Sequence, residues 1–307
     1  MTPSRPLRFL VALLLALAAC ESGDPPDSEG AADTAAAAGP PVVEITAVDY
    51  AFRAPAELPS GWTTIRMENA GAEEHFLSLW KLPEGRTLED YVGEVAPAFG
   101  EAYAALVEGA SKEEAGAILG QAIPAWYAEV VPMGGPGFLS PGRTGETTVR
   151  LEPGTYVMEC YVKTPDGRFH GELGMIQQLT VTADSTGVAE PSGDVEVVLS
   201  NAGIVGPSSL AAGEHTVMVR FSEQPEIGLG NDVHLVRLQE GTDLEELAAW
   251  MDWMEIEGLK APAPAEFLGG AQERSAGESA YFRVEVEAGR YGWVSEPLGR
   301  ISRVEVE

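Results

Sequence analysis

The sequence predicts an all-β protein that contains two tandem β-sandwiches, each with a helical insertion. Short segments alternate apolar and polar residues between Gly- and Pro-rich turns, which is typical of antiparallel sandwiches. The pattern of the first half then recurs in the second half, which indicates two copies of one domain. In both halves a stretch with helical periodicity interrupts the strands.

Residues 1–19 predict an export signal. Arg5 and Arg8 precede an apolar run over 9–19 that is too short to span a bilayer comfortably. The run ends in "LAAC", which resembles the lipobox of bacterial lipoproteins. That resemblance implies that Cys20 is acylated and becomes the first residue of the mature chain. The alternative is an ordinary cleaved signal followed by a chance cysteine.

Residues 20–41 are rich in Gly, Pro, Ser, Ala and acids without apolar periodicity, so we expect a disordered tether. Glu21 is compatible with outer-membrane sorting, as the resemblance to lipoproteins implies. No other apolar stretch approaches the length of a transmembrane helix. We therefore expect an exported protein that contacts the membrane through its lipid anchor alone, on the periplasmic face of the outer membrane or at the cell surface.

The chain is strongly acidic, with a formal net charge of −29. Loss of the signal, with its two Arg residues, leaves 17 basic and 48 acidic residues and a net charge of −31. This charge argues against nucleic acid and anionic membranes as partners and favours cationic ones. Solubility or adaptation to salt is the alternative interpretation.

The first domain, predicted over 42–183, contains most of the clear strand signals. Turn sequences such as "LPSGW", "LPEGR" and "EPGTY" separate them. The expected strands cover residues 42–52, 62–69, 75–82, 146–152, 155–162 and 175–183.

A helical insertion is predicted over about 87–129, between the third and fourth of these strands. Its apolar residues follow a helical stripe that Pro97 must kink or break. Ser111 and Glu114 form a capping-box pattern that opens a second helix. We expect the insertion to pack on the sandwich, with a lid or a partner surface as the alternative.

The repeat places a linker at 184–193 and a second domain at 194–307. In the second copy, "PSSLAAGEHTVMVRFSE" follows the plan of "PAELPSGWTTIRMENAG" and "VEAGRYGWVSE" follows that of "LEPGTYVMECY". The helix that contains Trp250 and Trp253 is expected to pack in the core of this copy, with binding of a partner as the alternative.

Alignment of the two copies singles out a few residues of the first. Ser295 occupies the position of Cys160, and Asn231 occupies the position of His75. The second copy ends soon after Ser295 and has no counterpart of His170 or Met175. The fold therefore does not require these residues, which makes them candidates for function.

Cys160 has no partner for an intrachain disulfide if Cys20 is acylated. Three interpretations remain: a small buried apolar residue, an intermolecular disulfide, or a metal ligand.

The first copy resembles the cupredoxin family, of the plastocyanin/azurin-like type. The resemblance is carried by "NAGAEEHFLSL", with His75 after a turn, and by the order Cys160, His170, Met175 before the last strand. It implies two Greek-key cupredoxin-like sandwiches, with one type 1 copper ion in the first domain and a degenerate second domain without metal ligands. The implied ligands are the imidazoles of His75 and His170, the thiolate of Cys160 and the axial thioether of Met175.

These donors suit copper that changes valence, because thiolate and thioether favour Cu(I) and imidazole binds both oxidation states. Nine residues, "YVKTPDGRF", separate Cys160 from His170, a longer spacing than is common in small blue copper proteins. The Pro-Asp-Gly turn within them predicts a hairpin-like loop that returns His170 to the site. Glu74 and the backbone near Asn69 are expected to support the ligands.

The implied function is one-electron transfer or copper handling in the cell envelope, without substrate turnover. No Ser-His-Asp arrangement, phosphate-binding loop, HExxH or CxxC motif indicates an enzyme. The acidic surface favours a basic redox partner such as a c-type cytochrome. The alternatives are a copper-free interaction or scaffold lipoprotein and a copper-scavenging or delivery protein.

Overall fold

The computed structural model describes residues 39–225, 229–296 and 299–307. The predicted signal peptide, Cys20 and all but the last residues of the predicted tether lie outside them. Within the described residues, no helix has the length and apolar character needed to cross a bilayer. Residues 38–307 group as one unit by their internal contacts, so the predicted domain boundaries and linker stay predictions.

The first half forms two packed sheets around a long strand, β3 (Glu57–Asn69). The first residues of β3 pair with β8, and the remainder pairs with β1 and β6, so this one strand contributes to both sheets. The other strands of this half are β1 (Val42–Val48), β2 (Ala51–Arg53), β4 (Ser78–Lys81), β5 (Val131–Pro132), β6 (Thr144–Leu151), β7 (Gly154–Glu159) and β8 (Ile176–Ser185).

All six predicted strands are present, with changed boundaries. The segment predicted as one strand over 42–52 is divided into β1 and β2, which pair as a hairpin. The strand predicted over 75–82 begins only at Ser78, because His75 forms an isolated bridge instead. β7 ends at Glu159, one residue before Cys160. The ligand candidates therefore lie just beyond strand ends, where loops can aim them.

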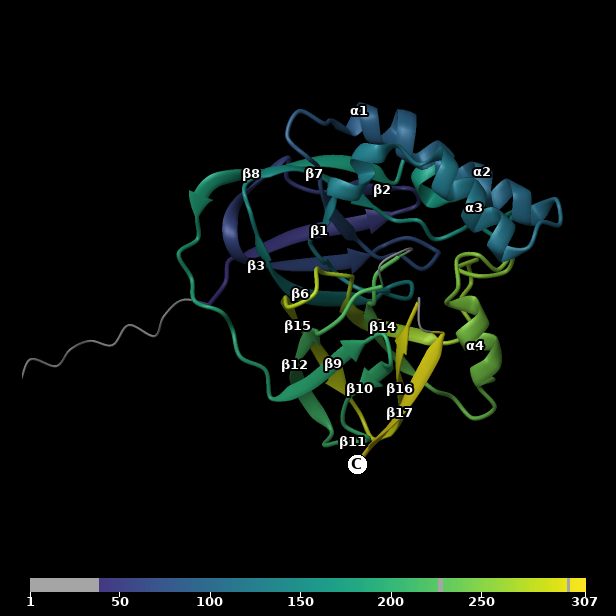
Figure 1. Ribbon diagram of the computed structural model, residues 1–307. Coiled ribbons are helices and arrows are strands. Elements are labelled where there is room, and N and C mark those ends of the chain that lie inside the picture. The colour runs from purple at the N-terminus through teal and green to yellow at the C-terminus, as the bar shows by residue number, and fades with distance from the viewer. Residues whose placement is uncertain (1–38, 226–228, 297–298) are drawn as a thin grey trace, which may run out of the picture. The chain divides into compact units, whose positions relative to one another are not determined.

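The helical insertion is present where it was predicted and lies outside the sheets of the first half (Figure 1). Ser111 and Glu114 form the predicted capping box. The helical segments are α1 (Leu88–Asp90), η1 (Tyr91–Val95), α2 (Ala96–Val107), α3 (Lys112–Ala122) and η2 (Ala125–Glu129). Pro97 follows the π-helical segment η1 and lies in the first turn of α2, so the helical path continues through it but changes its hydrogen-bond pattern there.

The second half repeats the two-sheet plan, which confirms the predicted all-β fold of two tandem Greek-key sandwiches with helical insertions. Its helix, α4 (Leu244–Trp250), starts at the N-cap Asp243 and ends before Trp253. Its strands are β9 (Val195–Ser200), β10 (Gly203–Val205), β11 (Ser209–Leu210), β12 (Gly213–Phe221), β13 (Val233–Arg237), β14 (Glu266–Ala271), β15 (Ser279–Val286), β16 (Gly289–Ser295) and β17 (Arg300–Val306).

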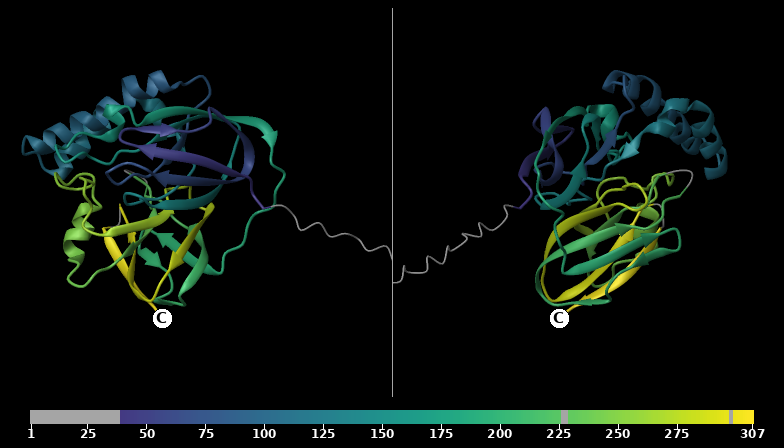
Figure 2. Two further views of the ribbon diagram at one scale, coloured as in Figure 1. Left: turned by 180° about the vertical axis from the view of Figure 1, so that it is seen from behind. Right: turned by 60° about the vertical axis from the view of Figure 1, so that its left-hand side comes forward.

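The two halves share a sheet. β15 of the second half pairs antiparallel with β6 of the first, with Phe282 opposite Thr147 (Figure 1, Figure 2). Buried side chains of both halves form one continuous apolar cluster. The guanidinium of Arg274 donates to the carbonyl of Met133 at 2.9 Å. The second half is therefore packed directly against the domain that contains the ligand candidates.

Lys163 joins the halves through a buried amine. Its Nζ donates to the carbonyls of Trp253 at 3.0 Å and Glu255 at 2.9 Å, and it lies 4.1 Å from the ring centroid of Tyr103. The side chain is fully buried, and this burial lowers the pKa of Lys163 to about 7.

Replacement of Lys163 by Met should change how stability depends on pH. The unfolded chain keeps this proton up to its ordinary pKa of 10.5, whereas the folded protein releases it near pH 7. The unfolded state therefore binds more protons between these values, so wild-type stability should rise relative to Lys163→Met by about 2 kcal/mol from pH 7 to pH 9. Denaturant unfolding of both proteins across this range measures the difference, and a difference independent of pH would contradict the assignment.

Candidate metal centre

Three of the four predicted ligands converge in the folded chain. Nδ1 of His75 lies 3.8 Å from Sγ of Cys160, and Nδ1 of His170 lies 3.7 Å from the same sulfur. The three donor atoms lie within 4.8 Å of one another, and all three side chains are 0% exposed. They form the one such cluster of His, Cys, Asp and Glu within the described part of the chain.

The spacing of the donors suits a single metal ion. Metal–imidazole bonds of about 2.0 Å and metal–thiolate bonds of about 2.3 Å, at a trigonal angle, place nitrogen and sulfur roughly 3.7 Å apart. Both nitrogen–sulfur distances agree with this value. Two imidazoles and one thiolate also form the donor set that trigonal copper sites use.

His75 is held by a loop that Asn69 organises. The backbone N–H of His75 donates to Leu139 O at 3.2 Å, and the N–H of Leu139 donates to His75 O at 2.8 Å. The Asn69 amide donates to Glu73 O and Leu139 O, and its oxygen accepts from the N–H of Gly71. The Asn69 side chain thus supports the site. Its hydrogen bonds connect the loop before His75 to the backbone of Leu139.

Cys160, His170 and Met175 are connected through backbone hydrogen bonds. The N–H of Cys160 donates to Met175 O at 3.2 Å, and the N–H of Met175 donates to His170 O at 2.9 Å. The Met175 side chain is fully buried. The main chain of Met175, the predicted axial ligand, is therefore hydrogen-bonded to the main chains of Cys160 and His170.

The long segment between Cys160 and His170 forms the predicted hairpin-like loop. Lys163 and Phe169 make an antiparallel bridge, and the N–H of Thr164 donates to Arg168 O at 2.9 Å. Gly167 has φ +87°, a value that glycine adopts without strain. The N–H of His170 then donates to Val162 O at 2.8 Å, which returns the imidazole toward the thiol.

Carboxylates orient both imidazole rings. Nε2 of His75 lies 2.8 Å from Oδ1 of Asp49, and Nε2 of His170 lies 2.8 Å from Oε2 of Glu73. An ionised carboxylate only accepts hydrogen bonds, so the ring protons are assigned to Nε2. The lone pairs of both Nδ1 atoms then face the sulfur of Cys160, as metal binding requires.

Burial keeps both rings neutral. It lowers the pKa of His75, against the opposing effect of Asp49. Burial, together with the neighbouring His75, lowers the pKa of His170 to about 3. The same burial raises the pKa of Cys160 to about 12, while the backbone amides of Phe76 and Val162 act in the opposite direction.

Asp49 and Glu73 are the residues that the sequence analysis missed. It favoured Glu74, which is wrong, because the Glu74 carboxylate accepts from the N–H of Ala263 in the second half. Glu73, its neighbour in sequence, contacts the ligand instead and also accepts from the Tyr50 hydroxyl at 3.2 Å. The sequence shows two acids, Glu73 and Glu74, directly before His75. It does not show which of the two contacts a ligand ring.

The second half has no equivalent centre among its described residues. Asn231 and Ser295, which align with His75 and Cys160, are both buried. The nearby His234 ring is bonded through Nε2 to Asp232 at 2.8 Å, and its Nδ1 accepts from the N–H of Phe138. Both nitrogens of that ring are therefore engaged in structural hydrogen bonds.

Comparison with known proteins finds blue copper proteins. No protein-family model matches the chain, and no curated protein matches it. Among solved structures, the chain is similar to reduced auracyanin from Roseiflexus castenholzii, with 21% identity over 47% of this chain and 99% of that chain and a TM-score of 0.27. It is also similar to auracyanin A, a "blue" copper protein from Chloroflexus aurantiacus, with 24% identity over 47% and 100% of the two chains and a TM-score of 0.28.

A longer match is the blue copper oxidase from Nitrosomonas europaea. It covers 86% of this chain and 85% of that chain, with 11% identity and a TM-score of 0.24. The solved structures that the chain resembles carry the names of blue copper proteins. The assignment of the ligands rests on the donor geometry described above.

Substitution of Gly71 by Ala should weaken metal binding. A Cβ atom at this position would lie 2.2 Å from Oδ1 of Asp49 and 2.6 Å from Nε2 of His75, so the hydrogen bond between them must open. We expect the metal affinity to fall roughly 10- to 100-fold, as is typical when the partner of a ligating imidazole is lost. Competition with a chelator of known affinity measures the change.

Gly116→Ala is the matched control, because a Cβ there meets nothing within 4 Å. Equal affinities for the two variants would contradict the role given to the pair of His75 and Asp49.

Proposed function

We propose that this chain binds one copper ion through His75, Cys160 and His170 and transfers single electrons. The observation that carries the proposal is the buried donor triad, in which carboxylates already orient both imidazoles. Bound copper would supply the one-electron chemistry. The side chains of the triad hold their donor atoms at trigonal spacing, and their burial excludes water.

Met175 is proposed as the axial thioether. Its support is its burial together with the backbone bonds that tie it to Cys160 and His170. Its thioether is a weak, soft donor, and together with two imidazoles and a thiolate it would suit both oxidation states of copper.

We also propose export, acylation at Cys20 and attachment to the cell envelope. The support lies in the charge, apolar core and cleavage pattern of residues 1–20. An unpaired Cys160 is compatible with an oxidising compartment, because a thiol that is buried and bound to metal is protected from disulfide exchange.

We propose a carrier that turns over no substrate. Both imidazoles are fully buried, and the side chains of the carboxylates that orient them, Asp49 and Glu73, are 28% and 15% exposed. Asp166, in the loop before His170, acts electrostatically on Glu73 and is paired with the exposed Arg168 at 3.3 Å. This acidic patch suits a basic redox protein such as a c-type cytochrome.

Copper loading of the full-length protein tests the metal assignment. We expect one copper per chain and an intense visible band from thiolate-to-copper charge transfer, lost in Cys160→Ser. His215→Gln is the control, because His215 lies on β12 and is bonded to Asp194. A colourless protein, or a band that survives in Cys160→Ser, would contradict the proposal.

Electron transfer to a basic c-type cytochrome should depend on salt. Because the chain is acidic, the bimolecular rate constant should fall as ionic strength rises, and Asp166→Asn should lower it further at low salt. Stopped-flow mixing measures the rate constant, with the exposed Glu108→Gln on the insertion as control. A rate constant that does not respond to salt would exclude docking through the acidic patch.

A further inference from the structure

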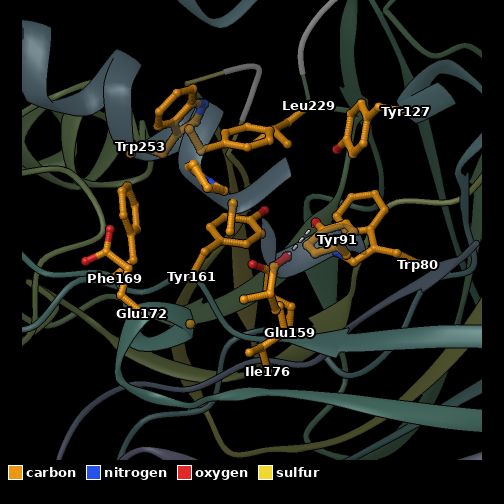
Figure 3. Close-up of a pocket in the computed structure, with 16 residues that line it drawn as sticks. Trp80, Tyr91, Tyr127, Glu159, Tyr161, Phe169, Glu172, Ile176, Leu229 and Trp253 are labelled. Atoms are coloured by element: carbon orange, nitrogen blue, oxygen red, sulfur yellow. Dashed lines mark hydrogen bonds between the residues drawn. The ribbon is translucent and has the colours of Figure 1, made fainter. Parts of the chain in front are cut away.

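Figure 3 shows a cavity of about 350 Å³ next to the segments that contain Cys160 and His170. Its lining includes residues adjacent in sequence to the ligand candidates. Glu159 and Tyr161 flank Cys160, and Phe169 and Gly171 flank His170. The volume falls in the range of small-molecule sites, so the cavity can hold a compact organic ligand.

The insertion and the second half build the remaining walls. Phe99 of α2 lies 5.6 Å from Trp253 of the second half and 6.2 Å from Tyr127 of η2, measured between ring centroids. In Figure 3, Trp253 and Phe169 lie on one side of Tyr161, and Tyr127 lies on the other. Trp253 and the insertion, which the sequence analysis expected to serve as packing, thus frame a cavity.

Seven of the sixteen residues on the walls are aromatic. The π-system of each ring carries a quadrupole with a negative face, which attracts cations. The aromatic residues on the walls besides Phe169 are Trp80, Tyr91, Phe99, Tyr127, Tyr161 and Trp253.

The lining has two acidic side chains, Glu159 and Glu172. Burial raises the pKa of Glu159 to about 7, and a cation in the cavity would favour its ionised form. Glu159 lies on the strand that leads to Cys160, and its carboxylate accepts from the Tyr91 hydroxyl at 2.9 Å. Glu172 is exposed and lies at the opening. None of the described residues that line the cavity is basic.

One basic group lies close by but outside the cavity. Lys163 is behind the wall, with its amine engaged by the carbonyls of Trp253 and Glu255 and by the Tyr103 ring.

Behind the wall, the Tyr161 hydroxyl donates to Glu296 at 3.0 Å. Burial raises the pKa of Glu296 well above its usual range and that of Glu273 to about 8, so these two acids add little negative charge at neutral pH. The negative charge of the cavity therefore comes from Glu159 and Glu172.

We infer that this cavity binds an organic cation with an apolar or aromatic body, such as a quaternary ammonium compound. Aromatic faces attract a cation within about 6 Å of the ring centroid, most strongly where water is excluded. The carboxylates of Glu159 and Glu172 add attraction for positive charge and disfavour anions. The apolar lining stabilises the body of such a ligand, which an inorganic cation lacks.

Calorimetry with two probes of the same shape tests the inference on the metal-free, full-length protein. The probes are (4-hydroxyphenyl)trimethylammonium and 4-tert-butylphenol, which differ by a charged nitrogen in place of a carbon. At about 0.15 M salt, where distant charges are screened, we expect one cation per chain, bound on the order of tenfold more tightly than the neutral probe. Because no copper is present, the result is independent of the proposed electron transfer.

Variants of the lining assign the binding to this cavity. Glu159→Gln and the exposed rim variant Glu172→Gln should each weaken the cation several-fold and leave the neutral probe unchanged. Phe99→Leu should weaken the cation by removing a ring face, while Glu108→Gln, on the same insertion but outside the cavity, should have no effect.

Two results would overturn the inference. Equal or tighter binding of 4-tert-butylphenol would make the cavity an apolar site without preference for charge. Cation binding that survives both carboxylate variants would reflect general attraction to an acidic chain. The rim variant guards against misfolding as the cause of a loss, because Glu172 is exposed.

Discussion

The metal centre depends on two hydrogen bonds that lie outside the donor set, from His75 to Asp49 and from His170 to Glu73. They fix the protons on Nε2 and leave both Nδ1 lone pairs directed at the sulfur of Cys160. Asp49 lies between β1 and β2, and Glu73 lies in the loop after β3. The register of β1 on β3, which places Ala47 opposite Asn69, therefore brings both carboxylates to the rings. The donors are arranged by the fold before any ion binds, and the cost of orienting them is met during folding.

The second half has the sandwich fold without an equivalent donor cluster among its described residues, and it contributes to the structure of the first half. It extends a sheet of the first half through β15 and β6, and the N–H of Ala263 bonds the acid next to Glu73. Trp253 comes from the same half and completes the aromatic cavity beside the ligand strands. The second half thus supports the sheet of the first half and forms one wall of the cavity.

The fold and the order of the ligands could be predicted because both depend on patterns among residues close together in the sequence. Strand alternation, the capping box at Ser111 and the comparison of the two copies needed no knowledge of distant contacts. Asp49 lies far from His75 in the chain and meets it only through strand register, so no spacing rule could identify it. The choice between Glu73 and Glu74 depends on which side chain the loop turns inward. Trp253 could not be placed either, because α4 ends at Trp250 and the following turns carry the indole away from the predicted helix.

The central claim is that Cys160, His75 and His170 together bind copper, and X-ray absorption at the copper edge of the loaded protein tests it most directly. We expect the copper to be bound by one sulfur and two nitrogens, with the sulfur at the short distance of a thiolate bond, about 2.3 Å. A shell that contains only oxygen and nitrogen would contradict the account, because it would place the ion on surface carboxylates of this acidic chain.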